Sequence, residues 1–382
     1  MRISSPTCFA TLLIFAFAGS AWAFQEENAD QRLERIKTSG KPVQISDFGK
    51  RVADEDNGAI PFQAALDSIS AYEIALFEFD QNVLMMQVDD KLKKLSSELN
   101  AKHPKLFAQL KSAAESRSFQ WKMKYQDVEP RDFLNDLMKQ SSRFRSAIRI
   151  LQFRTRILSA SGESAEAVDS ALAMMKLATH AENQPTLVCR MTGNTCRSMA
   201  LSSLVEVLQQ CDLDKSMHQA IENMLAEMEG DRFSRTLESE RAYGLSIATR
   251  MSSKTKTAYL NYFDLQLANA DKTFPEYQQV WKNMDKDARR QMLRHPLIAN
   301  VEPSISMSRR SLSRVQGFAR CVRIFNLIKL KKLERKNFAT AQLGLAKDLL
   351  LDPLTGKPIS VKPEKNGWRI EFSGGGIHPS EK

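Results

Sequence analysis

Residues 133–213 read FLNDLMKQSSRFRSAIRILQFRTRILSASGESAEAVDSALAMMKLATHAENQPTLVCRMTGNTCRSMALSSLVEVLQQCDL. In its first third, apolar residues recur at spacings of three, four and seven, which places them on one face of a helix. Ser161-Gly162-Glu163 and Asn183-Gln184-Pro185 then interrupt the helical pattern with residues that end helices. The stretch therefore predicts three consecutive helices joined by short turns.

Helices joined by such short turns lie antiparallel, and a hairpin of this kind leaves apolar faces that further helices must cover. Helical spacing recurs in the rest of the chain, over residues 59–79, 92–114, 217–228 and 306–336, while residues 271–303, rich in proline, are expected to be irregular. The fold class that we predict is mainly α, an irregular helical-hairpin array or bundle that resembles tetratricopeptide repeats at most.

The alternation of side chains changes after Leu351. Residues 359–361 and 368–372 alternate like strands, and Asn366-Gly367 between them is typical of a tight hairpin turn. Because a lone hairpin is marginally stable in water, we expect a small C-terminal β-hairpin docked on the helices.

These patterns divide the chain into five parts. We predict a signal peptide over 1–23, a polar extended lead-in over 24–58, a single helical domain over 59–350, the β-hairpin over 351–373 and a disordered tail over 374–382.

The N-terminus carries the features of an export signal. Arg2 supplies a positive charge, residues 8–18 form an apolar run that is short for a membrane span, and Ala21-Trp22-Ala23 matches a signal-peptidase site. We therefore expect export to the periplasm or the medium, with an uncleaved signal anchor as the alternative.

Four cysteines follow the expected cleavage site: Cys189, Cys196, Cys211 and Cys321. Cys189 and Cys196 are seven residues apart on one predicted helix, about 10 Å along its axis, which exceeds the reach of a disulfide. Cys211 could pair with Cys189 or Cys321, but the spacings form no disulfide framework. Free buried thiols are the favoured interpretation.

The chain is basic, with 55 lysines and arginines against 45 acidic residues. For an exported protein this excess points to an anionic envelope polymer, a lipid surface or a protein partner rather than nucleic acid. A solvated face that only keeps the protein soluble is the alternative. The arginines that we expect on a binding face lie on two predicted helices: Arg145, Arg149, Arg156, Arg310, Arg314 and Arg323.

No motif for a hydrolase, a phosphate-binding loop, a metal site or a cofactor is present. Glu238, Glu240 and His180 are weak catalytic candidates. Glu238 and Glu240 are two apart and so point to different helix faces, and we expect Glu238 to pair with Arg241 at a spacing of three. His180 at a helix end is explained by the negative end of the helix dipole.

The chain also resembles an uncharacterised family of exported bacterial α-helical proteins. The resemblance rests on Gly40-Lys41-Pro42, Asp56-Asn57-Gly58-Ala59, residues 154–185 with the Gly162 turn, Glu238-Ser239-Glu240-Arg241-Ala242, and the D-P-x-[ST]-G-K-P segment within residues 351–358. The last segment is also similar to the C-terminal part of type II secretion pseudopilins, whose prepilin cleavage motif and long N-terminal helix this chain lacks.

At one place the chain departs from the family pattern: Lys336-Asn337-Phe338-Ala339 stands where the family has a turn of Gly, an aromatic residue and Pro. The geometry that leads into the hairpin can therefore differ here. The resemblance implies a fold and export, and no activity.

Two functions remain open on these grounds. The first is an exported helical scaffold or binding protein that contacts an anionic partner through a basic face. The second is a cell-envelope hydrolase or lyase with acid and base residues near Glu238 and Glu240. We favour the first.

Overall fold

The computed structural model describes residues 28–49, 52–70, 88, 90–230, 233–248 and 252–379. Over these residues the chain is mainly helical and carries a small three-stranded antiparallel sheet near its C-terminus. The predicted fold class is therefore confirmed. The predicted signal peptide, residues 1–23, lies outside the described residues.

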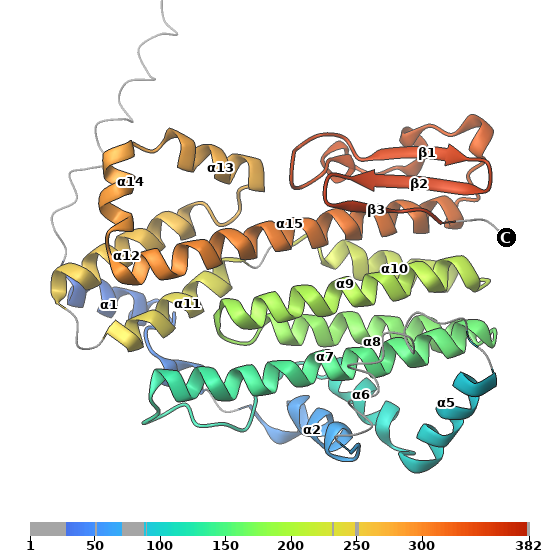
Figure 1. Ribbon diagram of the computed structural model, residues 1–382, viewed down its shortest axis with the longest axis horizontal. Helices are drawn as coiled ribbons and strands as arrows, with labels where there is room; N and C mark the ends of the chain where they lie inside the picture. Colours follow the sequence, from blue (N-terminus) through green and yellow to red (C-terminus); the bar gives the residue numbers. More distant parts are fainter. Residues whose placement is uncertain are drawn as a thin grey trace, which may run out of the picture.

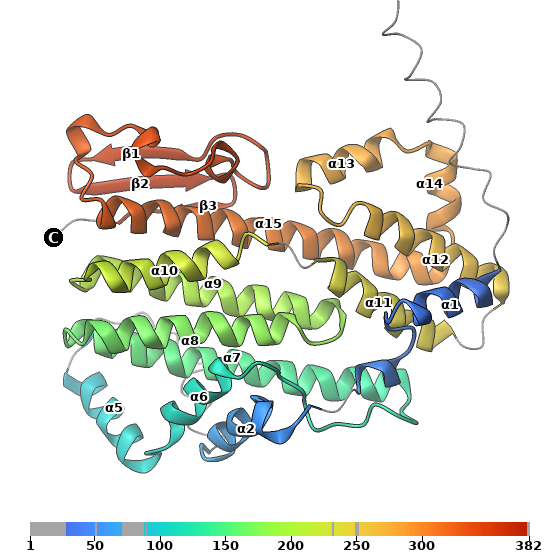
Figure 2. The same ribbon diagram turned by 180° about the vertical axis from the view of Figure 1, so that it is seen from behind.

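The three helices expected from residues 133–213 are present. α7 spans Pro130–Ala160, α8 spans Ser164–Glu182 and α9 spans Thr186–Gln210, and they lie side by side in both ribbon views (Figures 1 and 2). Gly162, in the first turn, has φ +78°, the left-handed conformation that glycine adopts easily. The apolar face predicted for α7 is buried, at Phe133, Leu137, Phe144, Ile148, Leu151 and Leu158.

α9 is the centre of the stack, because α7, α8 and the long helix α15 (Pro296–Leu330) all pack on it. Its buried residues are consequently spread around the helix, and several are polar. The buried polar residues of α9 include Arg190, Asn194, Arg197 and Ser203.

The contact between α8 and α9 is close at Gly193. A Cβ atom at this position would lie 2.8 Å from the backbone nitrogen of Glu182 and 3.0 Å from the carbonyl oxygen of Ala178. Ordinary carbon contacts are about 3.5–4.0 Å. Only glycine therefore allows α9 to approach the backbone of α8 this closely.

α15 connects two hydrophobic cores. Its first half contributes Ile298, Ile305 and Leu312 to a core shared with the helices on the left of Figure 1, and its second half contributes Val322, Phe325 and Ile328 to the main core of the stack. At 35 residues it is about 52 Å long.

Two expectations for this region are wrong. Residues 271–303 are largely helical, with α13 at Phe274–Asn283 and α14 at Lys286–Leu293, and α15 runs from Pro296 to Leu330 instead of over 306–336. The prolines at positions 275 and 296 sit in the first turns of α13 and α15, where an absent N–H leaves no hydrogen bond unmade. They start helices that we expected them to interrupt.

The prediction of a polar extended lead-in over 24–58 is also wrong in part. Ala29–Thr38 forms α1, whose N-terminus is closed by a capping box between Asn28 and Gln31. α1 packs on α12 (Ser253–Ala268), where Arg32 bonds Asn261 and Asp264.

On the other side of the stack lie α2 (Ala59–Asp67), α5 (Asp90–Lys102) and α6 (Leu106–Glu115). The break between α5 and α6 at His103 confirms the interruption expected there. The predicted helix over 59–79 is wrong beyond Asp67, because α2 ends there and residues 68–70 form a turn; residues 71–87 lie outside the described residues. Within the described part of the chain, no helix combines the length and the apolar character that a membrane span requires.

The C-terminal sheet has the order β1 (Ser360–Glu364), β2 (Gly367–Phe372) and β3 (Gly375–Ile377), and it packs on the second half of α15. The predicted hairpin is thus present, but the predicted disordered tail over 374–382 is wrong at β3. The Asp352 carboxylate stabilises the preceding turn, since it accepts bonds from Leu354 N, Thr355 Oγ1 and Ser373 N.

The close contact between α8 and α9 leads us to expect that the folded state is sensitive to substitution of Gly193. Gly193→Ala should lower the free energy of unfolding by about 1–3 kcal/mol, because the added methyl group meets backbone atoms that cannot move aside without shifting a helix. Urea denaturation measures the difference. Ser202→Ala, at an exposed position of the same helix, is the control and should change stability by less than about 0.5 kcal/mol. Equal effects of the two substitutions would contradict the close contact.

Candidate functional site

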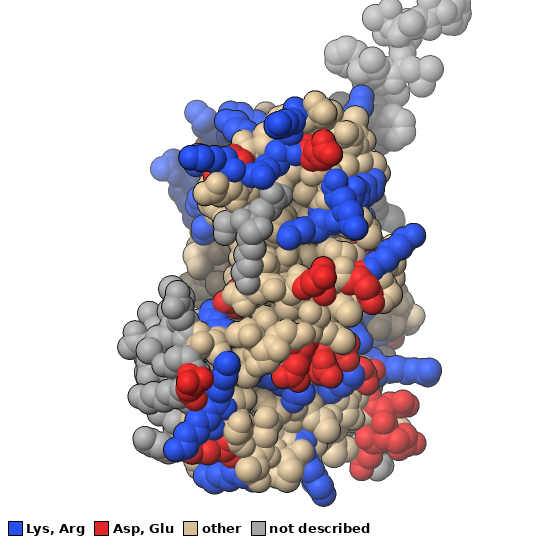
Figure 3. Space-filling model, turned by 90° about the vertical axis from the view of Figure 1, so that its right-hand side faces the viewer, with Lys and Arg blue, Asp and Glu red and all other residues tan. Residues whose placement is uncertain are grey.

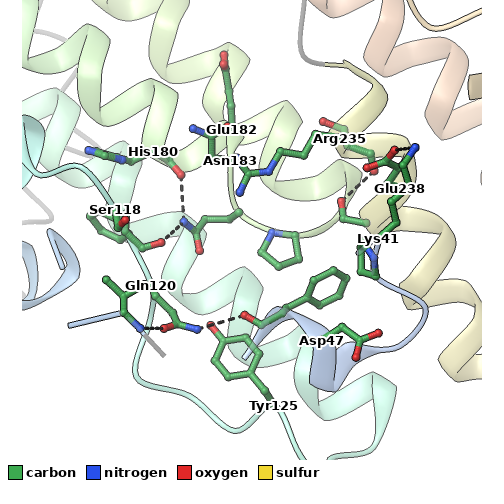
Figure 4. A pocket seen from close by; sticks show the side chains of 18 of the residues that line it. Lys41, Asp47, Ser118, Gln120, Tyr125, His180, Glu182, Asn183, Arg235 and Glu238 are labelled. Carbon is green, nitrogen blue, oxygen red and sulfur yellow. Dashed lines mark hydrogen bonds and ion pairs between the residues drawn. The ribbon is translucent and has the colours of Figure 1, made fainter. Parts of the chain in front are cut away.

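A pocket of about 810 Å³ opens at the end of the stack where α8 turns into α9. Its walls come from the α8–α9 turn, the start of α11 (Phe233–Ile247), the end of α1 with residues 40–48 and 52 after it, and residues 117–125 between α6 and α7. Figure 4 shows these segments around the cavity. Parts of the chain that are far apart in sequence therefore form one site.

Gln120 and Asn57 fix the segment over 117–125. The Gln120 amide donates to Phe48 O at 3.2 Å and accepts from Val52 N at 3.1 Å, which holds Phe48 and Val52 against this segment. Asn57 donates to Gln120 O at 3.0 Å and accepts from Gln120 N at 2.9 Å. Asn57 belongs to one of the segments on which the family resemblance rests, and its role here is structural.

The α8–α9 turn is held by a glutamine as well. Gln184 Nε2 donates to Phe119 O at 3.0 Å and to His180 O at 3.1 Å, as the dashed lines in Figure 4 show. One amide group therefore links the end of α8, through His180 O, to the 117–125 segment, through Phe119 O.

His180 lines the pocket but its ring points away from the cavity (Figure 4). The imidazole packs on Phe119, with 5.2 Å between ring centroids. Burial lowers the pKa of His180, and backbone groups of Ala114, Ser116 and Ala113 at the end of α6 oppose this by favouring the charged form. The ring therefore belongs to the contact between α8 and α6.

Glu238 lies on the other side of the pocket from His180 (Figure 4). Its carboxylate forms an ion pair with Lys41 at 2.7 Å, and the expected pair with Arg241 is absent from the ion pairs of the described residues. Arg241 is instead buried, at 2 % exposure. Burial lowers the pKa of its guanidinium, while the nearby charges of Glu238 and Asp264 act in the opposite direction.

Glu240 caps the N-terminus of α9. Its Oε2 accepts a hydrogen bond from Leu187 N at 2.8 Å, and the neighbouring Ser239 Oγ accepts one from Thr186 N at 3.3 Å. Pro185 precedes the helix and offers no side-chain cap. Two side chains from α11 thus satisfy amide groups that a helix start leaves open.

Burial raises the pKa of Glu240 to about 7, although the bond from Leu187 N acts in the opposite direction. The groups around it include Tyr243 and Tyr259, whose pKa values the charge of Glu240 raises further. Glu240 faces the α9–α11–α12 contact and is not among the residues that line the pocket at the α8–α9 turn.

The remaining acidic groups at the pocket are engaged. The Glu182 carboxylate points into the α8–α9 contact, where it pairs with Arg197, and Arg190 Nη1 lies 3.9 Å away. Asp47 Oδ2 accepts from Val43 N at 2.8 Å and from Gln44 N at 3.1 Å. Glu238, Glu240 and His180 therefore do not converge on a point where a substrate could meet both an acid and a base.

The mouth of the pocket carries cations that the sequence analysis did not single out: Lys37, Lys41, Arg117 and Arg235. Lys37, Arg117 and Arg235 are exposed, and none of these three has an acidic partner among the ion pairs of the described residues. Lys41 is within the Gly40-Lys41-Pro42 segment of the family resemblance. The segment was visible in the sequence, but its position beside α11 was not.

The six arginines expected on a basic face do not share one surface, because α7 and α15 both pack on α9 from different sides. Arg156 bonds Glu206 of α9 and Arg323 bonds Glu222 of α10 (Lys215–Glu227), each at 2.7 Å. Arg314 donates to Gly374 O at 3.3 Å. The other three are exposed or half-buried: Arg145, Arg149 and Arg310.

The four cysteines are free, which confirms the interpretation favoured from their spacing. Cys189, Cys196 and Cys321 are buried, and burial raises the pKa of each thiol to about 12. They are therefore protonated and unreactive at neutral pH. Among the described residues, no cluster of three or more histidine, cysteine or acidic side chains is arranged to hold a metal ion.

Comparison of the chain with protein-family models, with curated proteins and with solved structures finds no match. The resemblance to an exported helical family remains a prediction, and the site has to be interpreted from its own geometry.

The buried carboxyl group of Glu240 leads us to expect that the stability of the fold depends on pH. Between its ordinary pKa of 4.5 and its folded pKa of about 7, Glu240 holds a proton in the folded state that the unfolded state has released. The folded state therefore loses stability as the pH rises from about 5 to 8, by up to about 1.4 kcal/mol for each unit of pKa difference. Glu240→Gln, whose amide oxygen can still accept from Leu187 N, should remove this part of the pH dependence.

Urea denaturation at several pH values between 5 and 8 tests this expectation. Glu227→Gln, an exposed position of α10, is the control and should keep the slope of the unmodified protein. An unchanged slope in Glu240→Gln would contradict the protonated cap.

Proposed function

We propose that this protein is an exported helical binding protein that takes a small anionic ligand in the pocket at the α8–α9 turn. Export rests on the N-terminal sequence features, and the ligand class rests on the charges around the pocket. The helical stack acts as the scaffold that brings the four wall segments together.

One observation carries the proposal: cations without acidic partners surround the mouth, while the acidic groups are bonded to protein. Lys37, Arg117 and Arg235 are exposed there, whereas Glu238, Glu182 and Asp47 each have partners. An anion entering the pocket therefore meets cations free to bind it and few carboxylates free to repel it.

The size and lining of the pocket narrow the ligand further. A volume of about 810 Å³ lies within the range of small-molecule sites. Phe48, Phe119 and Tyr125 contribute aromatic rings to the wall. The ligand that fits this combination has an anionic group for the mouth and an apolar or aromatic part for the wall.

The alternative, a hydrolase or lyase using Glu238 and Glu240, has less support from the geometry. Glu238 is paired with Lys41, Glu240 caps α9, and the His180 ring points away from the cavity. A binding role uses the same pocket without requiring any of these groups to change partner.

Two fluorescent probes of similar shape test the proposal. Anilinonaphthalene sulfonate carries a negative charge, and N-phenylnaphthylamine carries none. The double variant Arg117→Gln/Arg235→Gln should bind the sulfonate at least tenfold more weakly than the unmodified protein and the neutral probe equally well, because only the ionic contacts are lost. Fluorescence titration at about 50 and 500 mM salt measures both, and salt should weaken only the sulfonate.

Arg290→Gln/Arg294→Gln, at exposed positions near α14, matches the change in net charge and should leave both affinities unchanged. Equal loss of sulfonate binding in the two double variants would show that general charge, and not the pocket, attracts the probe. Equal, salt-insensitive binding of both probes to the unmodified protein would also contradict the proposal.

A further inference from the structure

A second basic region lies at the end of the molecule that carries the C-terminal sheet, away from the pocket. It comprises the C-terminal end of α15, the residues that follow it and the β1–β2 turn. Residues 329–379 hold ten lysines and arginines against five acidic residues. In Figure 3 the basic side chains gather at the upper part of this end, over the sheet and the end of α15, while acidic side chains are more frequent below.

This basic end has a fixed framework. Arg335 Nη1 donates to Glu364 O at 3.2 Å and to Lys365 O at 2.7 Å, which ties the residues after α15 to the β1–β2 turn. Lys331 Nζ donates to Gln342 O and Leu343 O at 3.1 and 2.8 Å. The cations therefore sit on a framework that sets their spacing.

Three of the five acidic groups of this region are already engaged, while Glu334 and Asp348 are exposed. Glu364 pairs with Arg369 at 2.6 Å, Glu371 lies 3.6 Å from His378, and Asp352 is buried in its turn. The exposed lysines with no carboxylate within ion-pair distance among the described residues include Lys332, Lys336, Lys362 and Lys365. The positive charge at this end is consequently available to a partner.

We infer that this basic end docks on the anionic headgroups of a lipid surface. Lysine is a flexible, hydrated point charge, which suits phosphate groups whose positions are not fixed. None of the aromatic rings of the region is fully exposed: Trp368 is 1 % exposed and packs on the half-buried Phe338 with 4.8 Å between ring centroids. These two rings therefore offer a sugar polymer little surface for stacking, so a lipid surface is the better match than an acidic polysaccharide.

Docking of this kind would also orient the molecule. α15 and the stack run from the basic end toward the helices α11–α14, and the α8–α9 turn lies away from the sheet in both ribbon views (Figures 1 and 2). A lipid surface at the basic end would therefore lie at a distance from the α8–α9 turn, where the pocket is. The two charged regions are separate, and each can be removed without the other.

Co-sedimentation with lipid vesicles tests the inference. The full chain should bind vesicles of 30 % phosphatidylglycerol in phosphatidylcholine, should bind pure phosphatidylcholine much less, and should be released at about 0.5 M salt. Lys336→Gln/Lys362→Gln/Lys365→Gln should weaken binding to the anionic vesicles at least tenfold, since each lysine near such a surface contributes appreciably to attraction. Insertion of the apolar N-terminal segment would not respond to salt, so release by salt separates the two modes.

Lys286→Gln/Arg290→Gln/Arg294→Gln is the matched control, with the same loss of charge on and beside α14 at the far end. It should bind the anionic vesicles like the unmodified protein, and equal thermal midpoints should show that both triple variants fold. Equal weakening by both variants, or binding that ignores lipid charge, would overturn the inference. So would binding to dextran sulfate with no binding to vesicles, which would assign the basic end to an acidic polymer.

Discussion

The close contact of α8 and α9 at Gly193 determines the rest of the architecture. Because α9 approaches the backbone of α8 there, the Glu182 side chain is enclosed between the helices, where the Arg197 guanidinium compensates its charge. The same contact fixes where α8 ends and α9 begins. The α8–α9 turn is therefore rigid, and Gln184 can tie it to the 117–125 segment. The pocket is a consequence of this packing, since its walls are segments attached to that turn.

The start of α9 explains why α11 lies where it does. Pro185 offers no side-chain cap, so Ser239 and Glu240 of α11 supply the acceptors for Thr186 N and Leu187 N. This tertiary cap joins the second hydrophobic core, to which α11 belongs, to the main stack. The cap also places the Glu240 carboxyl group at the start of α9 and not in the pocket. Lys41 similarly uses Glu238 to hold the segment after α1, so both carboxylates of the Glu238-Ser239-Glu240 sequence position backbone.

The periodic parts of the fold could be predicted from the sequence, and the exceptions have physical causes. The three central helices follow from apolar spacing and from turns at Gly162 and Pro185. The prolines at positions 275 and 296 were misleading because proline is common both in the first turn of a helix and shortly after its end. At the site, the spacing of Glu238 and Glu240 correctly indicated different faces. Their partners could not be predicted, because Lys41 and Leu187 reach them only through the tertiary fold.

The basic side chains of this protein have two different roles in the structure. Arg156, Arg197 and Arg323 each bond a glutamate of a neighbouring helix, so they stabilise packing and contribute little free charge at the surface. A planar guanidinium with several donors suits such partly buried bonds better than an ammonium group does. Lysines such as Lys336, Lys362 and Lys365 remain exposed beyond α15. Part of the arginine content of the helices therefore forms ion pairs between helices, and the charge available to an outside partner lies with the lysines of the C-terminal end, the cations around the pocket and exposed arginines such as Arg145 and Arg310.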